Sequence, residues 1–432
     1  MFPIYSKANT SYYFFMKIRK NTIIIIVTAV LLVIATITAI LVINHVKAVR
    51  LEKEMHEKPI KIAFYNLDTK TQEALKKVIV AEWENLSTEF AYEFAYLDGS
   101  KPADDYLFDD YSIGLLFSDS YTAEAIQNLA VKPDPAVYST MPIAVRSITK
   151  TAVPLLLDDF EVLYNIKALS ANSFSPSPLL NETLAFAKTA GSGRRFTVGC
   201  AGKDDKTLGM LVASCMESFY SDESLEKLWK AIQNAEKASD TTDIFENVVE
   251  AAGNESFKVT LDTLCQWKKS GLFHSEWYAM TQQEVEYLME TELFSVVFMP
   301  LSVHRTVSFR TIEKYTESFF PAERVEGAST GRSLIFSILT GTVIKNRFED
   351  KSTVCMELLT KLTSLQNQAT IANSTGLAPV SSTAETPDKQ ASNARLWAAA
   401  SEKPLHGLND AFTKPEAKTA FFNGLRDYLK IN

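Results

Sequence analysis

Cysteine is scarce in this chain of 432 residues, and its four cysteines include no Cys-x-x-Cys pair. They are Cys200, Cys215, Cys265 and Cys355. None is matched by a histidine at metal-ligand spacing, so the pattern of a zinc module is missing. Two disulfides could form in three different pairings, and four buried free thiols are an equally good interpretation.

The motifs of several common active sites are also missing. The stretch AGSGRR (190–195) lacks the GK[ST] ending of a phosphate-binding loop, and no GxSxG nucleophile elbow occurs. His274, His304 and His406 stand outside any HExxH or HxH pattern. Paired carboxylates are plentiful and would suit a glycosidase, but the sequence selects no pair. We therefore expect no catalytic residue, no metal and no cofactor.

Charge is absent from Ile23 to Ile43, a run of 21 residues in which threonine is the only polar type. At about 1.5 Å per residue a helix of this length spans about 31 Å, close to the hydrocarbon core of about 30 Å. A cleaved signal peptide is the alternative, but its apolar part has only about 7–15 residues. The pattern predicts a short cytoplasmic segment (1–22), a transmembrane anchor (23–43) and a stalk (44–58).

Basic residues flank this run equally, with four on each side up to residue 58. Those before the run lie closer to it, which favours an N-terminus inside the cell. We expect a single-pass protein of the inner or cytoplasmic membrane with a periplasmic or otherwise extracytoplasmic body. Residues 59–432 hold 36 Lys or Arg against 49 Asp or Glu, a net charge of −13. This balance argues against nucleic acid as a partner.

Alternating strand and helix patterns open the body and indicate an α/β fold. Residues 60–67 and 89–97 are typical of strands, with a helix between them for which Thr69 is a candidate cap. Residues 111–120 form a further predicted strand. Ligands bind beyond the carboxyl ends of strands in open α/β sheets, which makes Asn66, Asp68 and Asp119 candidate contacts. For each, helix capping is the alternative.

Five stretches, in this order, resemble the bacterial extracellular solute-binding proteins of the maltose/oligosaccharide type, which deliver ligands to ABC importers. They are IKIAFYNLD, GLLFSDSYTAEAIQNL, VPLLLDDFEVLYN, LFSVVFMPLSVHR and ELLTKLTSLQNQATIANSTGLAPV. The resemblance covers about residues 59–432. It implies two α/β lobes that close on a ligand, an N-lobe of 59–157 with 308–365 and a C-lobe of 158–307 with 366–432.

The resemblance also implies where a ligand would be held. Asp158 and Asp159 would cross between the lobes and face the cleft, although pairing with Arg or Lys at a lobe interface is the alternative. Met299, Leu301 and Phe412 would line the cleft from the C-lobe. Trp277 is a further candidate, and core packing is the alternative for it and for Phe412.

The predicted function is an extracytoplasmic solute-binding protein that captures a sugar or similar small polar solute for an ABC permease. A diverged, membrane-tethered sensory or scaffold module is the alternative. The helical tether favours it, as does Leu301, which stands where an aromatic residue is common in the family. An enzyme is a third possibility and rests on the many carboxylates alone.

Overall fold

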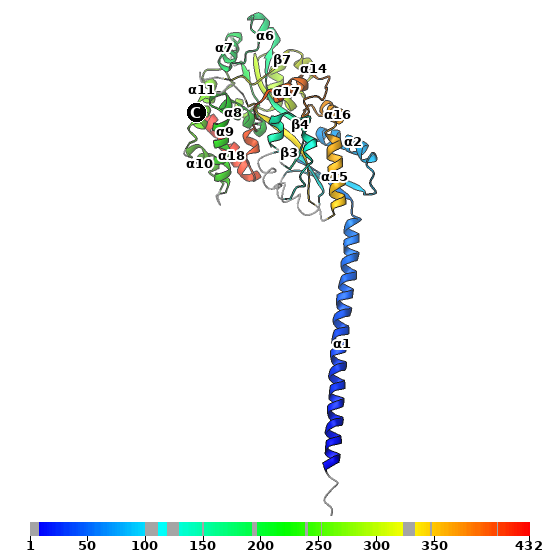
Figure 1. Ribbon diagram of the computed structural model, residues 1–432. Coiled ribbons are helices and arrows are strands. Elements are labelled where there is room, and N and C mark those ends of the chain that lie inside the picture. The colour runs from blue at the N-terminus through cyan, green and yellow to red at the C-terminus, as the bar shows by residue number, and fades with distance from the viewer. Residues whose placement is uncertain are drawn as a thin grey trace, which may run out of the picture. The chain divides into compact units, whose positions relative to one another are not determined.

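The computed structural model forms two compact units, Met1–Pro59 and Ile60–Asn432 (Figure 1). It describes residues 8–99, 111–118, 129–148, 151–191, 197–237, 241–251, 253–322, 333–345, 348–403 and 405–432.

The first unit is one helix, α1 (Ala8–His56). From Ile24 onward it is long and apolar enough to cross a membrane, and none of its most apolar window is buried in the protein. The hydroxyls of Thr28, Thr36 and Thr38 each donate to the carbonyl four residues earlier at 2.8 Å. The helix therefore satisfies its polar groups internally, as a lipid environment requires. The predicted stalk continues the same helix.

The second unit is built on nine paired strands in the order β2-β1-β3-β8-β4-β6-β5, with β7 and β9 also paired to β4. Their bounds are β1 (Ile60–Tyr65), β2 (Tyr92–Leu97), β3 (Ile113–Ser118), β4 (Val153–Asn165), β5 (Val198–Gly199), β6 (Val296–Pro300), β7 (Tyr315–Phe319), β8 (Phe336–Val343) and β9 (Ala378–Pro379). β1 runs parallel to β2 and β3, whereas β8 runs antiparallel to β3 and β4.

Strand β4 divides this unit into two lobes. Its first half, Val153–Asp159, pairs with β8, and its second half, Phe160–Asn165, pairs with β6 and β7. We call the part around β1, β2, β3 and β8 the N-lobe, and the part around β5, β6 and β7 the C-lobe. All 13 residues of β4 are buried, so this strand runs through the interior of both lobes.

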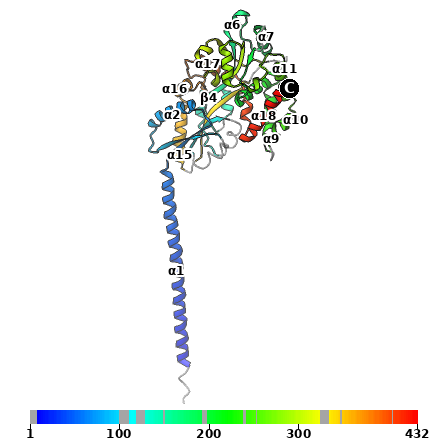
Figure 2. The same ribbon diagram turned by 180° about the vertical axis from the view of Figure 1, so that it is seen from behind.

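Helices cover each lobe, and Figures 1 and 2 show α2, α15 and α16 on the N-lobe and α9, α10, α11 and α18 on the C-lobe. Their bounds are α2 (Thr69–Glu84), α5 (Ile143–Ile148), α6 (Ile166–Ala171), α7 (Leu180–Ala190), α8 (Asp205–Phe219), α9 (Asp222–Glu236), α10 (Ile244–Glu250), α11 (Glu255–Lys269), α12 (Gln282–Glu290), α13 (Leu301–His304), α14 (Phe309–Ile312), α15 (Glu349–Leu362), α16 (Leu365–Thr375), α17 (Lys389–Ala400) and α18 (Pro415–Ile431). Each lobe has its own apolar core, with Leu75 and Leu358 in one and Leu208 and Phe421 in the other.

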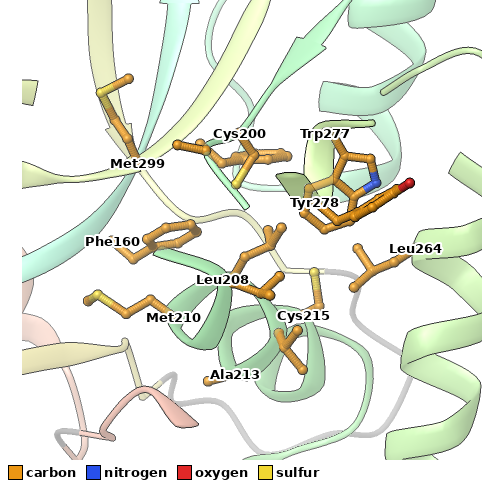
Figure 3. Close-up of a cluster of buried hydrophobic side chains, with 14 of the residues drawn as sticks. Phe160, Cys200, Leu208, Met210, Ala213, Cys215, Leu264, Trp277, Tyr278 and Met299 are labelled. Atoms are coloured by element: carbon orange, nitrogen blue, oxygen red, sulfur yellow. The ribbon is translucent and has the colours of Figure 1, made fainter. Parts of the chain in front are cut away.

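The C-lobe core holds three of the cysteines, Cys200, Cys215 and Cys265, among apolar side chains, and Figure 3 shows the first two. All four cysteines are buried free thiols, which confirms one of the two interpretations of the sequence. Burial raises the pKa of Cys200 and Cys215, so these thiols stay protonated and unreactive near neutral pH.

The packing differs from the predicted lobe boundaries at two elements. β7, placed by the sequence in the N-lobe, pairs with Glu161–Asn165 of β4 in the C-lobe. α16, most of which was predicted in the C-lobe, packs against α2 in the N-lobe. The chain therefore returns to the N-lobe only at β8 and stays there through β9.

Candidate functional site

A pocket of about 190 Å³ lies between the two lobes. The N-lobe contributes Tyr65, Asn66 and Gly99, and the C-lobe contributes Asn409, Phe412, Thr413, Lys414, Pro415, Lys418 and Thr419. On the N-lobe side the pocket lies at the carboxyl ends of the parallel strands β1 and β2. This is the edge at which open α/β sheets bind ligands.

The N-lobe wall depends on two residues in the left-handed conformation, Asn66 at φ 49° and Gly99 at φ 72°. The Asn66 amide N–H donates to the carbonyl of Leu97 at 2.8 Å, which ties the end of β1 to the end of β2. A Cβ on Gly99 would lie 2.9 Å from the Asn66 Cβ. Glycine therefore lets the two strand ends approach, and Asn66 remains exposed on the pocket side.

A buried carboxylate, Glu236 at the end of α9, fixes the C-lobe wall. It accepts hydrogen bonds from the Thr413 hydroxyl at 2.6 Å and from the backbone N–H groups of Thr413 and Lys414 at 2.8 and 2.6 Å. The Lys414 ammonium donates to the Glu236 carbonyl at 3.1 Å. These bonds hold the turn that leads into α18. Sequence reasoning missed Glu236 because nothing local marks a partner 177 residues away.

One side chain on the C-lobe wall remains open to a ligand. Lys418 is half-buried, and its ammonium has no hydrogen bond or ion pair to any residue in the described ranges. Asn409 also borders the pocket, but its Oδ1 is buried beside Gly407 and Gly209 and has no hydrogen-bond partner in that same part of the chain. Phe412 packs on Phe421 and Phe422 with ring centroids 5.1 and 6.0 Å apart, so its ring is mainly core and only borders the pocket.

The structure brings Asn66 and Phe412, two of the nine predicted contacts, into this pocket. Asp68 instead caps α2, where its carboxylate accepts from the Thr71 N–H at 2.9 Å. The capping alternative, with Asp68 in place of Thr69, is therefore correct. Asp119 lies outside the described residues.

Three apolar candidates lie elsewhere. Trp277 and Leu301 are fully buried in core clusters and reach no cleft, so core packing is the correct interpretation for both. Figure 3 shows Trp277 beside Tyr278 within the C-lobe core. Met299 borders a different pocket, inside the C-lobe between β6 and α12.

Asp158 does not face the cleft, because it is fully buried and fully paired. Its carboxylate forms an ion pair with Lys206 of α8 and accepts from the Ser302 N–H at 2.8 Å and the Ser302 hydroxyl at 2.6 Å. Burial lowers the pKa of Lys206, but Asp158 more than offsets this and the net direction is upward. The Lys206 ammonium also lies 4.5 Å from the centroid of the Phe117 ring, so it joins the C-lobe helix α8 to the N-lobe strand β3.

Asp159 and Glu161 continue the acidic run along β4 and are also buried, which corrects the prediction that Asp159 faces the cleft. Burial, together with the nearby Glu161 carboxylate, raises the pKa of Asp159. Burial and the neighbouring Glu317 raise the pKa of Glu161, whose Oε2 lies 2.6 Å from Nδ1 of His304. Burial lowers the pKa of His304 to about 4. These groups form a largely uncharged cluster at the hinge between the lobes.

Comparisons with known proteins give no match to a family model and none to a curated protein. Solved structures do match. The bacterial solute receptor AcbH is 12% identical, with a TM-score of 0.60 over 86% of this chain and 98% of AcbH. Maltose-bound MalE3 of T. maritima is 13% identical, with a TM-score of 0.54 over 85% and 99% of the two chains. RafE of Streptococcus pneumoniae is 11% identical, with a TM-score of 0.59 over 86% and 97%.

The match includes nearly the whole length of each of these solved structures. The part of this chain that is matched is about as long as the unit Ile60–Asn432. The structural similarity agrees with the features described above, which are two lobes, a strand shared by both lobes and a pocket at the strand ends. The chain has the two-lobe fold of the periplasmic sugar-binding proteins, preceded by one apolar helix.

Proposed function

We propose that this protein is a membrane-anchored, extracytoplasmic solute-binding protein that captures a sugar or similar small polar solute between its lobes. The observation that carries the proposal is the pocket itself, which has walls from both lobes and lies where β1 and β2 end. A ligand that contacts Asn66 on one wall and Asn409 on the other stabilises the closed arrangement over the open one. Binding and closure are then a single equilibrium and need no chemical step.

The known ligands of the matched structures support a sugar. AcbH prefers β-D-galactopyranose, MalE3 was solved with maltose, and a further structure shows RafE with raffinose. An ABC permease is the partner that such receptors serve, and we extend that partner to this chain as part of the proposal. The helix α1 would anchor the protein, with residues 1–22 in the cytoplasm and the lobes outside.

The proposal is tested by thermal unfolding of the full-length chain in detergent against a panel of monosaccharides, oligosaccharides, amino acids and polyamines. A ligand at about 100 times its Kd stabilises the native state by about 2.7 kcal/mol, which raises the melting temperature. The variant Asn66→Gly keeps the left-handed backbone and removes only the amide side chain. We expect it to abolish the shift while the unliganded melting temperature changes little. A panel without any shift would favour the sensory or scaffold role instead.

A further inference from the structure

The charged residues that the structure describes at the pocket between the lobes have one sign. Of the described residues that border it, Lys414 and Lys418 are the charged ones, although residues 59–432 carry a net charge of −13. Two cations at a site of about 190 Å³ point to a ligand of opposite charge.

Lys418 differs from Lys414 in its surroundings. Its ammonium is half-buried and forms no ion pair with the residues that the structure describes. Lys414, by contrast, already donates to the Glu236 carbonyl at 3.1 Å. The Glu236 carboxylate is buried and bonded to Thr413 and the Lys414 N–H, and it forms no ion pair with Lys418. An anionic ligand group would form a charge-assisted hydrogen bond with Lys418.

The remaining polar groups suit hydroxyls. Asn66 presents its exposed amide from the N-lobe, and Thr413 and Thr419 add polar groups from the C-lobe. The pocket therefore combines partners for hydroxyls with partners for one negative charge.

We propose that the pocket selects a sugar that bears an anionic substituent, such as a uronic acid, and that Lys418 binds that substituent. This inference rests on the proposed function, because it assumes that the pocket between the lobes is the ligand site. It departs from the neutral sugars named for the matched structures, which are galactopyranose, maltose and raffinose.

The experiment measures the dissociation constants of matched pairs on the full-length chain in detergent by calorimetry. The probes are galactose with galacturonate, glucose with glucuronate, glucose 6-phosphate, and neutral maltose and raffinose. The variants are K418Q and, as a matched control, K430Q, which removes the same charge from the exposed far end of α18. We expect an acidic sugar to bind at least about tenfold more tightly than its neutral partner. K418Q should weaken acidic binding about 10- to 100-fold, much more than it weakens the binding of the neutral partner, and K430Q should bind both as the wild type does.

The outcomes separate this inference from the proposed function. Equal binding of neutral and acidic partners, or no effect of K418Q on acidic binding, overturns the inference and leaves the proposed function standing. Binding of glucose 6-phosphate but not of the uronates supports the anionic group and identifies it as a phosphate. The absence of binding by every probe, neutral and charged, overturns both.

Discussion

Three carboxylates in one buried strand, β4, are accommodated in three ways. Asp158 is paired with Lys206 and Ser302, and Glu161 lies against His304. Asp159 has an oxygen, Oδ1, without a hydrogen-bond partner in the described part of the chain. A buried carboxylate with neither a cation nor enough donors retains its proton. The stability of the hinge should therefore depend on pH.

Asp159→Asn tests this dependence. Burial raises the pKa of Asp159 well above 3.8, so the native state holds a proton that the unfolded chain releases as the pH rises. Wild-type stability is therefore lost through this group as the pH increases from about 4 to the native pKa, by up to about 1.4 kcal/mol per pH unit. The variant cannot titrate there and should become more stable relative to wild type across that window. Urea unfolding from pH 4 to 9 measures the difference.

The matched control is Asp243→Asn, because Asp243 is exposed at the start of α10. This variant controls for the loss of a carboxylate at the surface rather than within the buried strand. If Asp159→Asn proved less stable than wild type at pH 8, the native carboxylate would be charged and paired, contrary to our interpretation.

At the residue scale, sequence reasoning located the unusual carboxylates but not their partners. The adjacent acids at 158 and 159 stood out within an apolar run. Lys206 and Ser302 lie 48 and 144 residues away from Asp158, and no local pattern links them. Asn66 was predictable because strand ends are local features. The pocket residues Lys414 and Lys418 sit in an ordinary amphipathic helix start and gave no signal.

Helix and strand ends were the most predictable elements. Gly271 follows α11 at φ 77°, and Gly376 ends α16 at φ 89°, which is the left-handed conformation that glycine favours after a helix. The cap of α2 was misplaced by one residue, since both Asp68 and Thr69 have suitable oxygens and only the fold decides between them. Glycines in the connecting loops also adopt positive φ angles, and their importance for stability can be tested.

Gly99→Ala and Gly253→Ala should have unequal effects on stability. Both glycines have a positive φ, at 72° and 90°, so alanine strains the backbone at either position by about 1–2 kcal/mol. A Cβ at Gly253 would meet nothing within 4 Å, whereas one at Gly99 would lie 2.9 Å from Asn66. Gly99→Ala should therefore lower the free energy of unfolding by more than Gly253→Ala in urea titrations.

The same pair of variants should also differ in ligand binding. Gly99→Ala should displace Asn66 and weaken the binding of any panel sugar that stabilises the wild type, and Gly253→Ala should not. Equal effects of the two variants on both stability and binding would mean that the N-lobe wall of the pocket adjusts to the added Cβ without cost. Gly99 would then not determine the position of Asn66.

At the scale of the whole molecule, helix α1 predicts how the protein fractionates. Its uncharged run has threonine hydroxyls satisfied by its own carbonyls, which suits a lipid environment. The full-length chain should stay in the membrane pellet after an alkaline carbonate wash, and a variant lacking residues 2–58 should be released. Release of the full-length chain by carbonate alone would contradict anchoring by this helix. Immunoblots of the two fractions provide the measurement.

The two-lobe architecture was predictable because five stretches in a fixed order resembled one family. The lobe boundaries were less predictable, because they depend on which edge of the sheet each later strand joins. β7 pairs with β4 beside the hinge, and only the register across distant segments reveals it. Likewise, the pocket forms only where residues near positions 66, 99 and 414 come together in the fold. Their spacing in the sequence does not show that they are neighbours.

The late return of the chain to the N-lobe has a consequence for synthesis on the ribosome. The hydroxyl of Thr340 in β8 donates to the Leu116 carbonyl in β3 from 224 residues further along. At about 5–20 residues per second, β3 emerges about 10 to 45 s before the strand that covers its edge. During that interval an unpaired strand edge is presented to any nearby chaperone or protease.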